Sequence, residues 1–203
     1  TALVSGSKTV GAAKALVTVT DAAFNSSSNT ETIAATTLSG IGGKTTGTVT
    51  LQNKVRIEGT KTEVSTALSG GSSVVASQTD TEAVVTNAVS VSEGDAIAKV
   101  SKIQGIFSGG VTDSLSSLAT GGSTQAKLDT ITGDDADVNI TVSDAAFNAV
   151  SNTDTVTAAD LSAVGNATTG TVTVTNAVKI TGSVSDLTTA LVSGSKTVGA
   201  AKA

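Results

Sequence analysis

Short runs that alternate apolar β-branched residues with polar residues, mostly threonine, occur at residues 17–20 and 138–142. A period of two predicts a strand with one buried face. Each run leads into the sequence Asp-Ala-Ala-Phe-Asn, which is typical of a turn. We expect the two equivalent aromatic residues of these turns, Phe24 and Phe147, to fill one corner of the core.

A longer extended stretch is predicted twice, at residues 48–58 and 171–181, each time after Thr-Thr-Gly. Asn53 and Asn176 stand at the same place in the middle of the two stretches. Asparagine is depleted in strands, so we expect a bend or a bulge at that position.

A helix is predicted between these strands, at residues 157–164. Thr157 with Asp160 fits a capping box, in which the hydroxyl accepts a hydrogen bond from a free backbone N–H and the acid accepts one in return. Gly165, or its counterpart Gly42, is expected to end this helix.

A second helix is predicted at residues 61–68 and 184–192, and both copies begin with capping-box spacing. The capping pairs are Thr60 with Glu63 and Ser183 with Asp186. The apolar residues of the second copy fall on one helical face, namely Val184, Leu187, Ala190 and Leu191. In the middle of the chain, the pair Ser92 and Asp95 predicts a helix with the apolar face Ile97, Val100 and Ile103.

The chain repeats itself at two spacings. Residues 1–15 recur without change as residues 189–203, at an offset of 188. Residues 17–68 align without gaps with residues 140–191, with 28 identities in 52 positions. The first repeat indicates a window on a longer tandem array, which would continue past Ala203 with the sequence from Leu16 onward.

The spacings also predict how the chain is divided. Each period of 188 residues holds about three units of roughly 62 residues, a length typical of repeat architectures. We assign residues 1–15 to the end of a preceding period, 16–72 to repeat unit 1, 73–137 to a degenerate repeat unit 2 and 138–203 to repeat unit 3.

A single unit of this kind is too small to bury its own apolar faces. Stacking successive units gives each strand a neighbouring strand and each helix a sheet to cover. We therefore expect a β-rich α/β fold, a repeat solenoid of stacked strand-helix-strand-helix units. The alternative is an ordinary globular α+β domain, which explains the composition but leaves the recurrence of residues 1–15 unexplained.

Composition excludes several classes of function. The chain has no His and no Cys, which removes the imidazole base, the thiolate and the usual zinc ligands. Its net charge of −5 and its single arginine, Arg56, argue against binding to nucleic acid. Aromatic residues make up 1% of the chain, which leaves little for stacking on bases or sugars. No apolar run approaches the roughly 20 residues of a membrane span.

Catalysis is not expected. A serine triad is impossible without histidine, and nothing in the sequence singles out a Ser–Lys pair or a pair of carboxylates. The nearest approach to a phosphate-binding loop is residues 40–46, but Leu38 stands where such a loop needs its first glycine. We interpret this segment as a helix end followed by a turn.

The one dense acidic cluster is the candidate metal site. It consists of Asp134, Asp135 and Asp137, and ligands that are all oxygen suit Ca²⁺. The spacing matches neither an EF-hand loop nor a calcium-binding nonapeptide, so a solvated turn is the favoured interpretation and calcium the alternative. No other cofactor is expected.

Two further groups of polar residues have structural interpretations. Asp21 and Asp144 occupy equivalent positions after a strand, where we expect them to accept backbone N–H bonds in the turn. Three asparagines begin an Asn-x-Ser/Thr triplet, which in this Ser- and Thr-rich chain arises readily from composition. They are Asn25, Asn139 and Asn166.

Three segments carry a family resemblance. The sequences of residues 17–23, 159–170 and 171–175 resemble the Thr/Ala/Val-rich repeats of giant cell-surface proteins of marine cyanobacteria, of the swimming-motility type, and of related aquatic bacteria. The resemblance implies an exported, very long repetitive protein at the cell surface or in an extracellular filament. It implies no catalytic residues.

These observations predict a structural repeat segment of a long extracellular or cell-surface filament. Its expected partners are the preceding and following repeats of the same chain or filament, with self-association into fibres and without nucleic acid or a membrane span. The alternatives are an adhesin stalk or binding module, which would repeat a ligand patch along one face, and a phage tail fibre, which would be a trimer.

Overall fold

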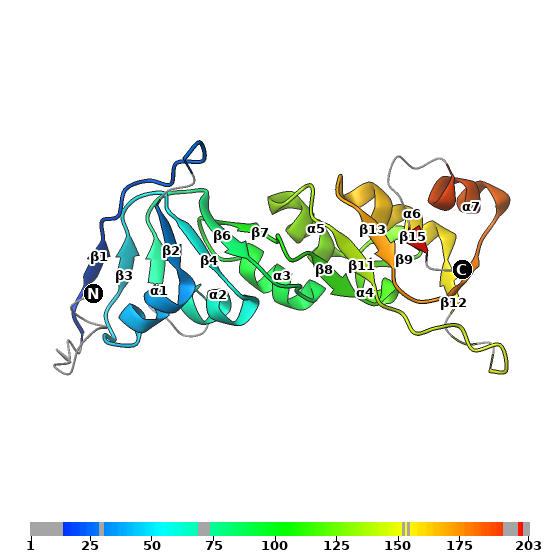
Figure 1. Ribbon diagram of the computed structural model, residues 1–203, viewed down its shortest axis with the longest axis horizontal. Coiled ribbons are helices and arrows are strands. Elements are labelled where there is room, and N and C mark those ends of the chain that lie inside the picture. Colours follow the sequence, from blue (N-terminus) through cyan, green and yellow to red (C-terminus); the bar gives the residue numbers. More distant parts are fainter. Residues whose placement is uncertain are drawn as a thin grey trace. The chain divides into compact units, whose positions relative to one another are not determined.

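The computed structural model describes residues 14–28, 31–68, 74–151, 153, 155–192 and 199–200. The chain divides into two compact units, a first unit of Thr1–Asn87 with Ala96–Ile106 and a second unit of Ala88–Asp95 with Phe107–Ala203 (Figure 1). Most of the duplicated segment, residues 1–15 and 189–203, lies outside the described residues, so its prediction stays open.

The first unit contains two parallel sheets. The strands of one sheet, in spatial order, are β1 (Val17–Val19), β3 (Val49–Leu51) and β5 (Val74–Ala76). The strands of the other are β2 (Thr32–Ala34), β4 (Arg56–Gly59), β6 (Thr81–Val85) and β7 (Ile103–Ile106). From β1 to β6 the chain enters the two sheets in turn, so both sheets grow together along the chain.

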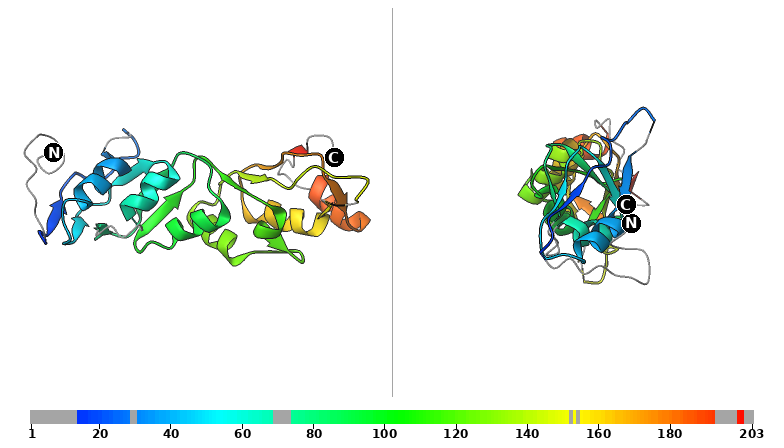
Figure 2. Two further views of the ribbon diagram at one scale, coloured as in Figure 1. Left: turned by 90° about the horizontal axis from the view of Figure 1, so that it is seen from below. Right: turned by 90° about the vertical axis from the view of Figure 1, so that its left-hand side faces the viewer.

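Two helices of this unit follow strands of the second sheet. They are α1 (Ala35–Gly42) and α2 (Lys61–Leu68), which lie against each other and are side by side in Figure 2. The helix α3 (Val91–Ala98) belongs to both units, because its part up to Asp95 falls in the second unit and the remainder in the first.

The second unit repeats part of this arrangement around a 4-stranded parallel sheet. Its strands, in spatial order, are β8 (Val111–Asp113), β11 (Ile140–Val142), β13 (Val172–Val174) and β15 (Gly199–Ala200). A parallel pair is formed by β12 (Thr155–Thr157) and β14 (Lys179–Thr181), and a hairpin by β9 (Ala119–Thr120) and β10 (Ser123–Thr124). The helices are α4 (Leu115–Leu118), α5 (Ala126–Asp134), α6 (Ala158–Ala167) and α7 (Val184–Leu191).

The two sequence repeats have the same strand register. Val17 pairs with Val49 in the first unit, and their counterparts Ile140 and Val172 pair in the second unit. The pairs β2–β4 and β12–β14 likewise join equivalent residues in the two units. We refer below to segments 17–42 and 49–68 of the first unit and to their counterparts 140–165 and 172–191.

The predicted α/β class is confirmed, with helices and parallel sheets in both units, but the predicted order within a unit is wrong. Each segment runs strand–strand–helix rather than strand–helix. The strands β2 and β12 were not expected, because such short runs directly before a helix show no clear period. The stretch predicted at residues 48–58 is two strands in different sheets, and the expected bend at Asn53 separates them.

The predicted alternation in the strands is confirmed. In the predicted run at residues 138–142, Val138, Ile140 and Val142 are buried, whereas Asn139 is exposed and Thr141 is half-buried. The prediction for the aromatic residues is wrong. Phe24 and Phe147 are only half-buried, and the phenylalanine with a buried side chain is Phe107, which is 2% exposed.

The helix starts were predicted better than the helix ends. The capping pair Ser183 and Asp186 forms a complete capping box, and Thr157 accepts the N–H of Asp160. Gly42 is the last residue of α1, as expected, whereas Gly165 does not end its helix, because α6 continues to Ala167.

The predicted cap of the middle helix is wrong. The cap of α3 is Ser90, whose hydroxyl lies 3.3 Å from the N–H of Glu93, and the N–H of Ser90 donates to that glutamate at 2.8 Å. The helix therefore begins at Val91, earlier than the Ser92–Asp95 pair requires. The predicted apolar face of Ile97, Val100 and Ile103 does not form, because the helix ends at Ala98 and Ile103 begins a strand.

Candidate functional site

The predicted acidic cluster lies at the end of α5. Asp134 is the last residue of this helix, and Asp135 is half-buried after it. The Asp135 carboxylate accepts the N–H of Phe107 at 2.6 Å. The pKa of Asp135 is raised to about 6. Burial is the main cause, the N–H of Phe107 opposes it, and the nearby Asp137 and Asp134 add to the rise. This carboxylate is therefore partly protonated near neutral pH.

Among the described residues, no three acidic side chains are grouped closely enough to hold a metal ion. One carboxylate oxygen of Asp135, a predicted calcium ligand, accepts a hydrogen bond from the backbone N–H of Phe107 and so has a structural role. Calcium binding by Asp134, Asp135 and Asp137 stays a prediction.

Asp21 and Asp144 were expected to accept backbone N–H bonds within their own turns. Asp144 does accept a backbone N–H, but from another part of the chain. Its carboxylate accepts the N–H of Leu115, the first residue of α4, at 2.6 Å. This amide lies far earlier in the chain rather than in the same turn. Asp113 does the same for the first amide of α3 at Val91, at 3.1 Å. In both cases a carboxylate at or just after the end of a strand accepts the first amide of an earlier helix, where negative charge is favourable.

The remaining candidate residues have ordinary surroundings. Two of the sequon asparagines use their amide oxygen locally, Asn25 for the N–H of Ser27 and Asn139 for the N–H of Thr171. Asn166 is exposed within α6. Residues 40–46 form the end of α1 and a turn, as expected, with the N–H of Gly43 bonded to the carbonyl of Ser39.

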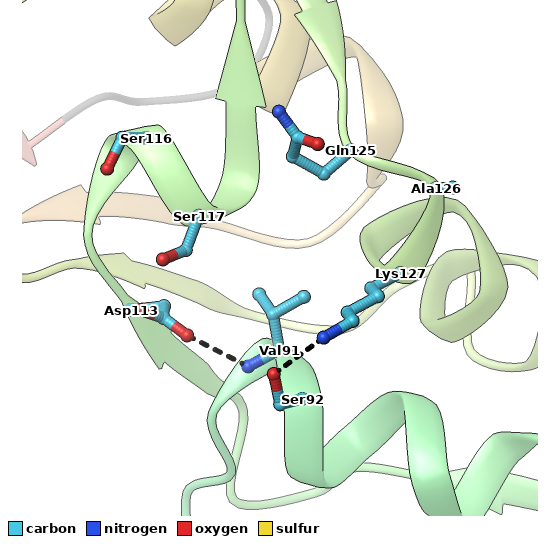
Figure 3. Close-up of a pocket in the computed structure, with 8 residues that line it drawn as sticks. All are labelled: Val91, Ser92, Asp113, Ser116, Ser117, Gln125, Ala126 and Lys127. Atoms are coloured by element: carbon cyan, nitrogen blue, oxygen red, sulfur yellow. Dashed lines mark hydrogen bonds between the residues drawn. The ribbon is translucent and has the colours of Figure 1, made fainter.

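A polar pocket of about 410 Å³ was not anticipated from the sequence. It lies in the second unit between the first turns of α3 and α5 and the helix α4 (Figure 3). The residues that line it are Val91, Ser92, Asp113, Ser116, Ser117, Gln125, Ala126 and Lys127. Hydroxyl groups dominate its lining, with one carboxylate, one amide and one ammonium.

The closest polar pair in this pocket joins two helices. The ammonium of Lys127 lies 2.9 Å from the hydroxyl of Ser92, as Figure 3 shows. Both side chains are exposed, so the ammonium stays hydrated, whereas a catalytic lysine is activated by desolvation or by a neighbouring cation. The pair therefore acts as a surface bond between α5 and the start of α3.

The most consistent set of contacts in both units lies between successive segments. The hydroxyl of Thr45 donates to the carbonyl of Ala15, and that of Thr168 donates to the carbonyl of Val138, both at 2.6 Å. The glycine that ends each Thr-Thr-Gly donates its N–H back to the threonine at 2.9 Å. The repeated Thr-Thr-Gly thus fastens one segment to the strand before it.

The glycines of this motif are required by space. A Cβ on Gly47 would collide with the carbonyl of Ala15, and a Cβ on Gly170 would collide with the carbonyls of Asp137 and Val138. Any other residue would have to move the backbone of the neighbouring segment.

Asparagine supplies a second repeated contact. The amide of Asn53 donates to the carbonyl of Asp21, and that of Asn176 donates to the carbonyl of Asp144, both at 2.7 Å. The backbone N–H groups of Phe24 and Phe147 also donate to backbone carbonyls of the following segment. The bend predicted at these asparagines therefore also ties consecutive segments together.

A cation covers each of the two motif phenylalanines. The guanidinium of Arg56 lies 3.8 Å from the ring centre of Phe24, and the ammonium of Lys179 lies 5.4 Å from that of Phe147. Arg56 also forms an ion pair with Glu82 at 2.7 Å. The sequence analysis did not predict these pairs. In each pair, the cation lies as many residues after its phenylalanine as Val49 lies after its strand partner Val17.

Comparison with protein-family models, with curated proteins and with solved structures gave no match. In the part of the chain that the structure describes, no helix is both long enough and apolar enough to cross a membrane.

Proposed function

We propose that this chain is a structural repeat segment of a long extracellular or cell-surface filament, folded as an α/β solenoid in which tandem repeats stack. The observation that carries the proposal is the recurrence of one set of contacts in both copies. The strand register and the bonds made by Thr45 and Thr168 are the same at the same separation.

This arrangement suits a mechanical role. Parallel strands that follow one another form continuous ladders of backbone hydrogen bonds, and each repeat contacts chiefly its neighbours. Threonine and asparagine side chains add hydrogen bonds to backbone carbonyls of the preceding part of the chain, in both repeats. Small residues at the contacts, such as Gly59 against Ala35 and Gly182 against Ala158, allow the segments to approach closely.

The proposed partners are the preceding and following repeats of the same filament, and the proposed location is the cell surface or the extracellular space. The absence of cysteine and the predominance of small, unreactive side chains fit a repeated spacer. The low content of basic and aromatic residues supports neither nucleic-acid nor sugar binding.

Intact mass of the protein from its source tests this proposal. We expect a species many times larger than 19.6 kDa, and a species near 19.6 kDa would refute a covalent array. Diffraction from oriented fibres is an independent test. Stacked strands predict a reflection near about 4.7–4.8 Å along the fibre axis, because that is the distance between neighbouring strands.

A binding module is the second candidate, and the polar pocket of Figure 3 is the observation that favours it. Its hydroxyl groups and Lys127 could bind a small polar ligand. A binding role predicts loss of ligand retention on substitution of Ser117, which lines the pocket. A spacer role predicts no such ligand.

A further inference from the structure

The segments at the two ends of the described chain are less covered than their counterparts. Segment 172–191 corresponds to segment 49–68, so the exposed fraction of each residue can be compared with that of its counterpart. Leu68 of α2 is 7% exposed, whereas the equivalent Leu191 of α7 is 45% exposed. Ile57 of β4 is fully buried, and the equivalent Ile180 of β14 is only half-buried.

The cause of this difference is visible in the first unit. There β6 pairs with β4, and α2 packs against β5 and β6. Within the described residues of the second unit, β14 pairs only with β12 and stands at the edge of its sheet. The surface formed by β14 and α7 thus corresponds to one that a following segment covers in the other repeat.

Within the described residues, segment 17–42 lacks a neighbour on its other side, where its counterpart is covered by a preceding strand. Its strand β1 corresponds to β11, which pairs on both sides, with β8 and with β13. In the described chain β1 pairs only with β3. Accordingly Val17 is half-buried where Ile140 is 1% exposed, and Ile33 is half-buried where Val156 is 3% exposed.

From these matched deficiencies we propose that the surface of β14 and α7 binds segment 17–42 of a second copy of this sequence, with β2 of that copy paired in parallel to β14. The proposal rests on the stacking proposed above and assigns its interface. The identity of residues 1–15 and 189–203 supports the choice of occupant, because the sequence that follows α7 is the one that precedes β1.

The register follows from the pairs already formed. Lys179 pairs with Thr155 on one side of β14, and Thr32 of β2 is the counterpart of Thr155. We therefore expect Thr32 of the second copy to lie beside Lys179, with Ile33 beside Ile180. The half-buried Ile180 and the exposed Leu191 would then lose their contact with water.

Disulfide trapping tests this register, because the chain contains no cysteine of its own. Neighbouring strands place paired Cα atoms about 4.8 Å apart, which lies within the roughly 4.4–6.8 Å that a disulfide accepts. The full chain with Thr32→Cys and Lys179→Cys, oxidised at high protein concentration, is expected to form a ladder of covalent multimers on a non-reducing gel.

Three controls make the result specific. Thr155→Cys with Lys179→Cys joins two residues that pair within one chain, so it must close without forming multimers. Ala34→Cys with Lys179→Cys shifts the register along β2 while keeping the same strand face, and is expected to give few multimers. Each single cysteine is expected to give dimers at most.

A ladder from the Thr32→Cys and Lys179→Cys chain alone supports the interface. Equal yields from the shifted pair, or no ladder while the internal pair closes, would overturn it. The result is separable from the proposed function, because a high-mass filament from the source combined with a failed ladder would leave the stacking in place and reject only this interface.

Discussion

At the scale of single residues, the contacts that recur between segments leave little room for substitution. Gly170 touches the backbone of the preceding strand, whereas Gly165 in α6 has open space around the position of a Cβ. We expect Gly170→Ala to lower the free energy of unfolding by about 1–3 kcal/mol through overpacking. Gly165→Ala is the matched control and is expected to raise it by about 0.5–1 kcal/mol, since alanine favours the helix. Urea titration of both variants measures the difference, and equal effects would contradict the proposed steric role.

Asp135 makes a residue-scale prediction about pH. Its pKa in the folded chain is about 6, above the ordinary 3.8. A raised pKa means that the stability gained from the protonated form is complete below about pH 4 and is lost as pH rises through about 6. Asp135→Asn keeps an acceptor for the Phe107 N–H and removes the charge, so we expect it to be more stable than the natural chain at pH 7.

Thermal unfolding between pH 4 and 7.5 checks this prediction. The gain from Asp135→Asn should shrink toward pH 4, where the natural carboxyl is protonated. Asp21→Asn changes the net charge equally at an exposed position and serves as the control. Parallel pH profiles for the two variants would show that burial of Asp135 has no thermodynamic effect.

At the scale of elements, helix α3 separates two capping assignments. The structure assigns the cap to Ser90, whereas sequence spacing alone favoured Ser92. We expect Ser90→Ala to cost about 1 kcal/mol of the free energy of unfolding. Ser92→Ala removes only an exposed bond to Lys127 and is expected to change it by less than about 0.5 kcal/mol. Urea titration distinguishes them, and a larger loss from Ser92→Ala would restore the sequence-based assignment.

The elements also show where sequence reasoning succeeded and where it could not. Helix α2 was predicted with its boundaries, because the spacing of Thr60 and Glu63 fixes the start through local bonds. The strands β2 and β12 were missed, because such short runs carry too little periodicity and their pairing partners, β4 and β14, belong to the next segment.

The candidate site was harder to predict for the same reason. The sequence analysis assigned the cap of α3 to Ser92 and Asp95, whereas the structure places it at Ser90 and Glu93. Asp95 is 7% exposed, so it faces inward and is poorly placed for a cap at the surface. The pocket likewise joins Ser92 to Lys127, which are far apart in the sequence and carry no shared motif.

At the scale of the whole molecule, stacking of repeats makes stability depend on the number of repeats. In a linear array each added repeat contributes its own stability and one more interface with its neighbour. A chain of two periods, residues 1–188 followed by residues 1–203, would cover Ile180 and Leu191 of its first period with segment 17–42 of its second. We therefore expect its urea midpoint to lie above that of the single chain.

The control for this comparison is two complete copies of residues 1–203 joined by a long Gly/Ser linker, which keeps α7 and β15 intact in each copy. Such a linker behaves as a flexible coil and dilutes the contact between the periods without changing their folded parts. We expect its midpoint to approach that of the single chain. If the continuous and the linked chains unfold at the same urea concentration, the periods fold independently, and a continuous ladder through the filament is excluded.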